Sequence, residues 1–535
     1  MLFNSYIFLL GFLPITLAGF YVLSKFGHRL AAAWIAAASV FFYAWWNPPF
    51  VLLLVGSIAF NFRIGQLIAR RHAPERLKTG LLALGIAGNL GLLFWFKYLY
   101  SLLSALRAWG IADVAFESAI LPLGISFFTF TQIGYLMDVK QGATKDNGLL
   151  SYLLFVTFFP HLIAGPILHN REMMPQFADR RTYRFCAENF SVGLTVFVIG
   201  LLKKCLLADP FSETVQTGFA TPASLPFFSA WYAVICYSFQ LYFDFSGYSD
   251  MAIGLARMFN VRFPLNFNSP YKATGIIDYW QRFHMTLTRY LTLYVFNPLA
   301  LWITRRRVAS GKDISRKANA TLGGFGSLVL FPTMTTMTLA GIWHGAGLQF
   351  LVFGVLHGVF ISVNHAWRTF GGTYARADGR LIRGGCVLLT YFCACIGFVF
   401  FRAPSLEGAF QMLAGMAGLH GAGPALPVPE ALAAGALFDG WTAHGLITPA
   451  PLGVSAQNAA NILWIAVMYG VVWALPNTQQ FMTDYAPAFG KVQPGGALAW
   501  LRWRMSAPWA VAFGVGAVLG LLSLGGTTEF LYFQF

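Results

Sequence analysis

Long apolar runs alternate with short polar stretches along almost the whole chain. A helix needs about 20 mostly apolar residues to cross the hydrocarbon core of a bilayer. Runs of this kind predict transmembrane helices near residues 2–24, 30–47, 49–69, 79–103, 119–138, 150–168, 190–208, 227–256, 283–304, 327–345, 347–367, 384–401, 459–475 and 507–524. We therefore expect an all-α, polytopic membrane protein built as a bundle of roughly 11–14 helices.

Two of these runs contain residues that interrupt a helix. Pro160 and Pro166 fall inside residues 150–168, and Asp244 is one of several polar residues inside 227–256. At membrane depth, backbone that is not helical is tolerated only where protein or a water-filled cavity satisfies its polar groups. Both runs therefore predict broken or re-entrant helices around a central funnel.

The composition excludes an ordinary soluble protein. The chain is 57% hydrophobic and 10% charged, whereas soluble domains are about 25% charged. Its formal net charge is +16, and its basic residues cluster in short loops, of which one holds Arg70, Arg71, Arg76 and Lys78 and another holds Arg305, Arg306, Arg307, Lys312, Arg316 and Lys317. Such loops mark the cytoplasmic face of a multi-pass protein, so we expect membrane lipid and not nucleic acid as the partner of this charge.

The first apolar run predicts the orientation of the chain. Lys25 and Arg29 follow this run, and no basic residue precedes it. This order differs from that of a secretory signal peptide. Positive charge after the first helix places the N-terminus outside, and the next two helices then return the chain to the cytoplasm at the first basic loop.

A change in composition near residue 416 predicts the domain organisation. From Gly418 to Asn458 the chain is rich in Gly, Ala and Pro and has no helical period, which is typical of a long loop. We therefore divide the chain into a membrane core at 1–415, a loop at 416–458 and C-terminal membrane helices at 459–535.

Several residues that can bind metal have a simpler interpretation. The six cysteines lie in or beside apolar runs and form no CxxC pair. Cys393 and Cys395 are candidate metal ligands, but neither lies near a histidine that would complete a zinc ligand set, so we expect no metal. His161 and His169 flank the LIAGP segment of the broken run, where a role at a helix end or an interface is expected.

Three histidines remain as candidates for chemistry inside the membrane, where ionisable groups are costly and usually functional. They are His284, His344 and His357. His344 lies beside Trp343 in LAGIWHGAGLQF, whose small residues allow close backbone approach. His284 lies in DYWQRFHMTLTRYL, near a predicted helix start. The competing interpretation of each histidine is a hydrogen-bonded packing residue.

Acyl transfer is a reaction that suits two histidines. A hydroxyl acceptor is a weak nucleophile at neutral pH, so a neutral imidazole within hydrogen-bond reach must take its proton. A second histidine can donate to the thioester carbonyl, or orient the substrate while the tetrahedral oxyanion forms. His284 and His344 are far apart in sequence, so this reaction requires helix packing to bring them together.

Six motifs now point to a family, and they are LPLGISFFTF, FFPHLIAGPI, YFDFSGYSDMAIGLARMF, FPLNFNSPY, FHMTLTRYL and GIWHGAG, in that order. Together they resemble the membrane-bound O-acyltransferase (MBOAT) family. Within it the chain is most similar to the bacterial branch of alginate O-acetylation, peptidoglycan O-acetylation and teichoic acid D-alanyl transfer. The resemblance runs from Met1 to about Arg402 and includes PNTQQ at Pro476 and the terminal FLYFQF.

The resemblance implies both a site and an activity. The family pattern places His344 at the reaction centre of a helical funnel and makes His284 a second required residue. It implies an enzyme of the bacterial inner membrane that takes an acyl group at the cytoplasmic side, from acetyl-CoA or from an acyl carrier protein thioester. The group then passes outward to a periplasmic acetyltransferase partner or to a hydroxyl of a cell-surface polysaccharide.

Four further residues are candidates for lining the substrate channel: Trp343, Asp244, Ser246 and Asp278. Trp343 can form a stacking wall beside His344. The competing role for Asp244 is structural, because its carboxylate can cap a helix or satisfy broken backbone.

Two other functions stay open. D-alanyl transfer from a carrier protein would use the same histidines, since basic cytoplasmic loops can dock either CoA phosphates or an acidic carrier. A polysaccharide or lipid transporter is the alternative from another class. We find no internal repeat, and this weighs against a transporter.

Overall fold

The structure is a computed structural model and describes residues 1–111, 120–144, 148–372, 379–421, 456–490, 492, 498 and 500–525. Apart from one isolated bridge between Pro264 and Phe489, all regular structure in these residues is helical. The predicted all-α fold class is therefore confirmed.

Seven helical stretches of the described residues are long and apolar enough to cross a membrane. They are Ile7–Ser24, Pro49–Ile68, Glu75–Lys97, Ala187–Ala220, Leu322–His344, Leu348–Phe370 and Arg380–Arg402. Other apolar runs form shorter helices, such as α6 (Ile125–Lys140) and α26 (Ala507–Leu522). The chain is thus a multi-pass membrane protein in which full-length spans alternate with shorter helices.

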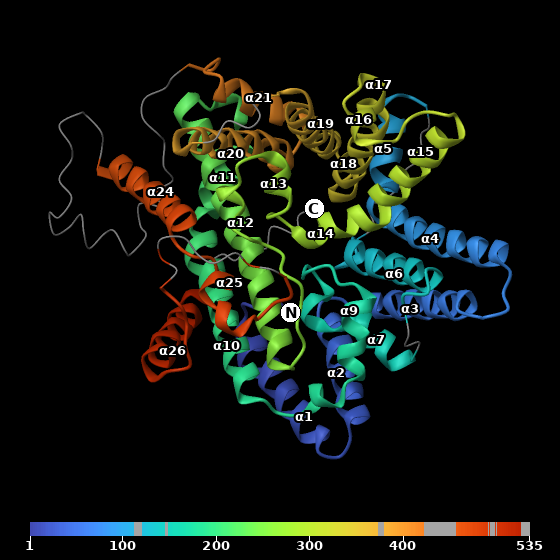
Figure 1. Cartoon of the computed structure of the whole chain (residues 1–535). Coiled ribbons are helices and arrows are strands. Elements are labelled where there is room, and N and C mark those ends of the chain that lie inside the picture. Colours follow the sequence, from blue (N-terminus) through green and yellow to red (C-terminus); the bar gives the residue numbers. More distant parts are fainter. Residues whose placement is uncertain are drawn as a thin grey trace.

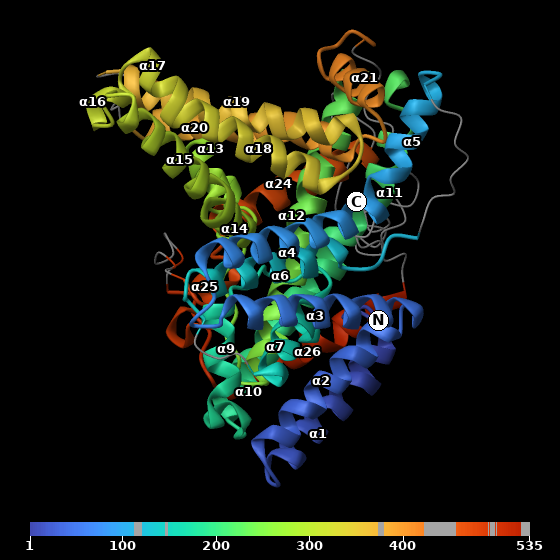
Figure 2. The same cartoon turned by 90° about the vertical axis from the view of Figure 1, so that its right-hand side faces the viewer.

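In Figure 2, α3 and α4 run side by side above α1 and α2, and α5 lies apart from them at the upper right. These helices are α1 (Leu13–Ser24), α2 (His28–Ala44), α3 (Pro49–Ile68), α4 (Glu75–Lys97) and α5 (Leu99–Ala108). Lys97 is the last residue of α4, and Tyr98 is the single residue between α4 and α5.

The run at 150–168 is broken, as predicted. It forms α7 (Leu149–Thr157) and the single turn α8 (Phe159–Leu162), and it then continues without helical structure to α9 (Asn170–Ala178). Phe158 separates the first two helices with a ψ angle of 109°. Pro160 follows in the first turn of α8, where proline is tolerated because its missing N–H has no helical partner.

A long central helix, α12 (Phe227–Met258), packs against α10 (Ala187–Leu202) through glycines. A Cβ atom added to Gly247 of α12 would lie 2.8 Å from the carbonyl oxygen of Gly200 on α10. Only a residue without a side chain fits there, so the two backbones approach closely. Figure 1 shows this helix pair running down the middle of the molecule.

The predicted break in α12 is wrong, because the helix is continuous over its 32 residues. A π-helical turn, Lys203–Ala208, continues α10 and carries two lysines to the carboxylates of α12. Lys204 Nζ lies 2.6 Å from Asp244 Oδ1, and Lys203 Nζ lies 2.6 Å from Asp250 Oδ2. Since a neighbouring helix pairs with both aspartates, α12 can carry them without unwinding.

The segment that follows α12 is irregular and leads into the histidine region. Residues 261–269 contain no helix, and short helices then alternate with turns. These helices are α13 (Ile276–Trp280), α14 (Met285–Leu291), a π-helical turn (Thr292–Phe296), α15 (Asn297–Ala309), α16 (Arg316–Asn319) and α17 (Leu322–Phe325).

Three longer helices cross the upper part of Figure 2: α18 (Phe331–His344), α19 (Leu348–Phe370) and α20 (Arg380–Arg402). Glycines again set the closest approach, since a Cβ atom on Gly354 of α19 would lie 2.9 Å from Gly341 Cα of α18. This contact fixes α18 along α19 only three residues before His344.

The remaining described helices are α11 (Ser212–Ala220), α21 (Leu406–Met416), α24 (Ala456–Ala474), α25 (Thr478–Phe481) and α26. Helix α26 packs against α10. Most of the predicted loop, at 422–455, and the terminal FLYFQF lie outside the described residues.

Buried apolar residues form two clusters that meet at the histidine segments. Trp343 belongs to the first cluster, whereas Met337 of the same helix belongs to the second. Leu287, three residues after His284, lies in the first cluster and Phe283 lies in the second. Both histidine segments therefore lie at the boundary between two cores.

Candidate functional site

His344 is the last residue of α18 and lies in a cage of aromatic rings. The centroid of its imidazole is 5.0 Å from that of Phe401 and 5.9 Å from that of Phe353, both in edge-to-face geometry. The residue is 7% exposed. Within the part of the chain that the structure describes, no hydrogen bond holds either of its ring nitrogens. The ring is positioned by packing, and its nitrogens stay available.

His284 directly precedes α14 and has a left-handed backbone with φ 48° and ψ 49°. This conformation is uncommon for a residue with a side chain and marks a site that its surroundings determine. The sequence prediction of a helix start here is confirmed. The imidazole is 2% exposed, and its centroid lies 4.7 Å from that of Phe245 on α12.

Asn266 determines which nitrogen of His284 carries the proton. The amide Nδ2 of Asn266 donates to Ser249 Oγ at 3.0 Å, so its Oδ1 is free to accept. Oδ1 accepts from Thr286 Oγ1 at 2.8 Å and lies 3.1 Å from His284 Nδ1. Because a carbonyl oxygen can only accept, His284 Nδ1 donates, and Nε2 of the neutral ring is left as an acceptor.

The acceptor nitrogen His284 Nε2 is buried and has no hydrogen-bond partner among the described residues. Leaving a buried polar atom unpaired is costly, and in native proteins such an atom points to a ligand, water or function. The arrangement is therefore an oriented imidazole whose free nitrogen is ready to accept a proton or a hydrogen bond.

The two predicted histidines lie in one neighbourhood. His284, His357 and Lys97 are all close enough to His344 to interact with it electrostatically. His357 lies on α19, where its Nδ1 accepts from Trp280 Nε1 at 3.2 Å. Its ring centroid is 4.7 Å from that of Phe353, which also contacts His344. Helix packing thus brings together segments that are distant in sequence.

Trp343 links the two histidine helices through stacked rings. Its indole stacks on Phe130 of α6 with centroids 4.9 Å apart, and Phe130 stacks on Tyr290 of α14 at 4.6 Å. One face of Trp343 is therefore occupied by protein. Its Nε1–H is buried and unpartnered among the described residues, and a substrate contact of Trp343 stays a prediction.

The other channel candidates lie in different surroundings. Asp244 pairs with Lys204, and Asp278 in the first turn of α13 binds Arg282 Nε at 2.7 Å. These pairs favour structural roles for both carboxylates. Ser246 is buried, and its hydroxyl has no partner in the described parts of α12 and its neighbours. The channel role of these residues stays a prediction.

His161 and His169 have local partners beside the broken segment. His161 Nε2 lies 2.9 Å from the carbonyl oxygen of Phe155. His169 immediately precedes α9, and its Nδ1 lies 3.1 Å from the Tyr294 hydroxyl, which donates to Asp138 Oδ1 at 2.8 Å. The helix-end role predicted for His169 fits its place, but its link to Tyr294 and Asp138 was not predicted.

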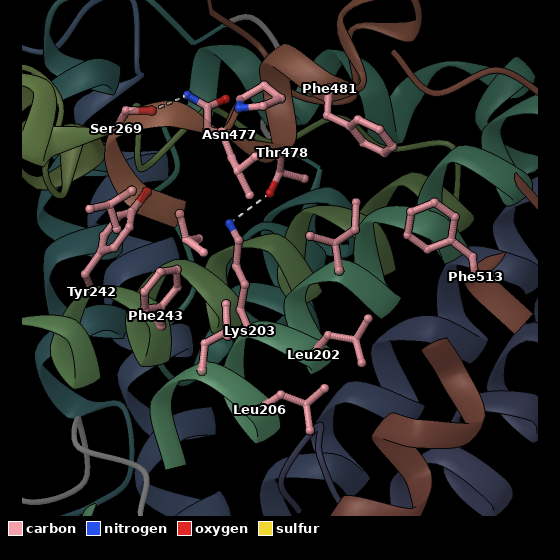
Figure 3. A pocket seen from close by; sticks show the side chains of 16 residues that line it. Leu202, Lys203, Leu206, Tyr242, Phe243, Ser269, Asn477, Thr478, Phe481 and Phe513 are labelled. Carbon is pink, nitrogen blue, oxygen red and sulfur yellow. Dashed lines mark hydrogen bonds between the residues drawn. The ribbon is translucent and has the colours of Figure 1, made fainter. Parts of the chain in front are cut away.

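A separate cavity of about 320 Å³ lies between α10, α12 and the C-terminal helices (Figure 3). Lys203 reaches into it and donates to Thr478 Oγ1 at 2.8 Å as well as to Asp250. Asn477 donates to Ser269 Oγ at 2.9 Å on another side of the cavity. The charged groups here are paired with each other, in contrast to the nitrogens at the histidines. Within the described residues, no group of three or more His, Cys, Asp or Glu could hold a metal ion.

Sequence comparison relates the chain to known proteins. Residues 92–311 match the model of the MBOAT, membrane-bound O-acyltransferase family, a stretch that includes His284 and ends before His344. The peptidoglycan O-acetyltransferase of Helicobacter pylori is 39% identical over 453 residues, which cover 79% of this chain and 80% of the relative. The probable alginate O-acetylase AlgI of Pseudomonas aeruginosa is 35% identical over 78% of this chain and 75% of its own length. The teichoic acid D-alanyltransferase of Bacillus subtilis is 27% identical over 52% of this chain and 68% of the relative.

Proposed function

This chain belongs to the membrane-bound O-acyltransferase family, and from that premise we propose that it passes an acetyl group from acetyl-CoA at the cytoplasmic side to the O-acetylation of a cell-envelope polysaccharide. The single observation that carries the proposal is the oriented His284, with an unpaired buried Nε2 in the neighbourhood of His344. The relatives that cover most of the chain are named for O-acetylation of peptidoglycan or alginate.

The proposed reaction uses the two histidines in different roles. His344 is the general base that takes the proton of the acceptor hydroxyl. The hydroxyl oxygen attacks the thioester carbonyl carbon, the C–S bond breaks, and the sulfur of CoA leaves as a thiol after His344 returns the proton to it. His284 assists by accepting a hydrogen bond at Nε2, which stabilises the imidazolium that forms on His344. The acceptor is a polysaccharide hydroxyl or that of a periplasmic acetyltransferase partner.

The proposed orientation places the N-terminus outside and the donor at the inner face of the bacterial inner membrane. The positions of the basic residues support it. The basic residues at 70–78 lie between the end of α3 and the first turn of α4, and those at 305–317 run from the end of α15 into α16. Basic residues at helix ends favour the cytoplasmic side. Positive loops at that face would also attract the phosphates of CoA.

D-alanyl transfer is the second candidate, and the similarity to the Bacillus subtilis teichoic acid D-alanyltransferase favours it. That similarity covers about half of the chain, whereas the O-acetylation relatives cover more than three quarters. An acetyl donor therefore has the greater support. An acyl-transfer assay with a D-alanyl carrier thioester in place of acetyl-CoA distinguishes the two functions.

The test measures transfer of radiolabelled acetyl from acetyl-CoA to envelope polysaccharide in membranes that contain the protein. We expect transfer by the wild type, its loss in His344→Ala and His284→Ala, and its retention in His365→Ala, a histidine further along α19. Undiminished transfer by His344→Ala would refute the assignment. Failure of the wild type with both acetyl and D-alanyl donors would favour a transporter.

A further inference from the structure

The helix that carries His344 ends at this residue, and its end is held by another part of the chain. The last turn of an α-helix has carbonyl groups without helical partners. In α18 these include the carbonyls of Ile342, Trp343 and His344, and the backbone becomes extended at Gly345. How these carbonyls are bound decides how firmly the His344 backbone is fixed.

Two adjacent residues at the end of α4 bind all three carbonyls. Lys97 Nζ donates to the carbonyl oxygen of Trp343 at 2.6 Å and to that of His344 at 2.8 Å. The Tyr98 hydroxyl donates to the carbonyl oxygen of Ile342 at 2.7 Å. About 245 residues separate the donors from the acceptors in sequence, so these bonds join two distant parts of the fold. We call this group of three bonds the α18 clamp.

The surroundings of Lys97 make the carbonyls its main partners. Lys97 ends a helix that is long and apolar enough to span a membrane, where a lysine is costly unless it is paired or functional. Among the ion pairs of the described residues, none includes Lys97. An ammonium group at a helix C-terminus is stabilised by the helix dipole, and its hydrogen bonds are stronger than neutral ones.

Together these contacts leave His344 constrained on two sides. The α18 clamp holds the backbone of residues 342–344, and the rings of Phe353 and Phe401 pack against the imidazole. The imidazole itself has no hydrogen bond to orient it within the described structure. A loose backbone at this residue would therefore move the ring directly.

We propose that Lys97, assisted by Tyr98, is a positioning residue for acyl transfer that holds the His344 imidazole in its reactive place by clamping the end of α18. The inference rests on the proposed function for its catalytic consequence, but the clamp is a property of the fold. A displacement of about 1 Å in a reacting group can lower a rate by about 100-fold. Loss of the clamp should therefore reduce kcat more than it changes KM.

The chain offers a matched control in Lys272. Its Nζ donates to the carbonyl oxygen of Leu475 at 2.9 Å, which lies directly after the end of α24. Lys272→Met thus removes a lysine bond to a helix-end carbonyl that belongs to another helix. A general loss of stability would affect both variants, whereas a positioning role affects only Lys97.

The first experiment measures kcat and KM for acetyl-CoA in purified protein, per amount of monodisperse protein. We expect Lys97→Met to lower kcat about 10- to 100-fold with KM within about threefold, and Lys272→Met to match the wild type. Lys97→Arg should recover most of the rate, because guanidinium keeps the charge and the donors. Tyr98→Phe, which removes one neutral hydrogen bond, should lower kcat about two- to fivefold.

The second experiment does not depend on acyl transfer. Diethyl pyrocarbonate modifies accessible imidazoles, and peptide mass spectrometry reports the rate at His344. We expect modification of His344 to be several-fold faster in Lys97→Met than in the wild type and unchanged in Lys272→Met. If Lys97→Met fails to fold, Tyr98→Phe and Lys97→Arg give the same comparison with smaller steps.

The two readouts separate the clamp from the proposed function. If the wild type transfers no acyl group but His344 is modified faster in Lys97→Met, the clamp stands and the proposed function fails. If transfer depends on His344 but neither kcat nor modification differs between Lys97→Met and Lys272→Met, the clamp is overturned.

Discussion

Two buried polar regions of this protein differ in how their polar atoms are paired. Where α10 meets α12, Lys204 lies 2.6 Å from both Asp244 and Asp209, with the Lys204 and Asp244 side chains each only 3% exposed. Near the start of α14 and the end of α18, His284 Nε2 and Trp343 Nε1 are buried without partners among the described residues. The paired charges of the first region hold two helices together. The unpaired polar atoms of the second region are what a substrate-binding site would present.

Hydrogen-bond pairing is a guide to the roles of buried ionisable residues in this membrane protein. Burial alone does not separate the regions, because both are almost completely covered. Pairing separates them, since a paired charge recovers part of its desolvation cost, while an unpaired donor or acceptor gains a partner only when something binds. We expect substitutions in the first region to change stability and those in the second to change catalysis.

His344→Ala should have the largest effect, because it removes the proposed general base. General acid–base catalysis contributes about 100- to 10,000-fold, and the loss in kcat should fall in this range with the folded yield unchanged. Acetyl transfer measured in proteoliposomes, with the protein quantified by fluorescence-detected gel filtration, checks both quantities.

Lys204→Met should lower the free energy of unfolding by an amount comparable to the rise in activation free energy expected for His344→Ala. Removing one partner of a buried ion pair costs about 3–5 kcal/mol, so the midpoint of thermal unfolding in detergent should fall sharply. Protein that remains folded should transfer acetyl groups at a rate within about twofold of that of the wild type. A normal midpoint together with a lost rate would place Lys204 in the catalytic region and break the comparison.

Asn266→Ala should lower kcat about tenfold, because the acceptor that fixes the His284 tautomer is lost. Without Asn266 Oδ1, the proton can shift to Nε2, which is then no longer an acceptor. Asn268→Ala is the control, since Asn268 lies two residues away and its side chain accepts from Asn477 instead. Equal losses in both variants would argue for a general effect of this loop.

Ser246→Ala should have the smallest effect and sharpens the assignment of the channel. Its unpaired hydroxyl belongs, by the pairing criterion, with the substrate-facing atoms. Loss of one neutral hydrogen bond should raise the KM for the acceptor about two- to tenfold, with the unfolding midpoint unchanged. If KM is unaffected and the midpoint of thermal unfolding rises, the hydroxyl is a buried unpaired group that lowers stability and does not bind the acceptor.

Much of the fold could be predicted from the sequence, because membrane helices leave strong local signals. Apolar runs predicted the all-α class, and Pro160 and Pro166 predicted the broken segment. The break expected in α12 was wrong because a buried carboxylate in an apolar run suggests an interrupted helix, and the partner that pairs with it lies on another helix. Lys203 and Lys204 supply that partner from α10.

The candidate site was predictable only in part, for the same physical reason. The motifs around His284 and His344 indicated the two histidines, but their neighbourhood depends on packing across two cores. Neither Asn266 as the partner of His284 nor Lys97 as the partner of α18 leaves a signal in local sequence. A lysine that ends an apolar helix is a clue to look for partners, although it does not identify them.

The most direct test of the account is the structure of the protein with a non-hydrolysable acetyl-CoA analogue. We predict that the acyl carbonyl carbon lies about 3–4 Å from a ring nitrogen of His344 or His284, with His284 Nδ1 still bonded to Asn266. An analogue whose acyl group lies in the cavity at Lys203, distant from both imidazoles, would contradict it.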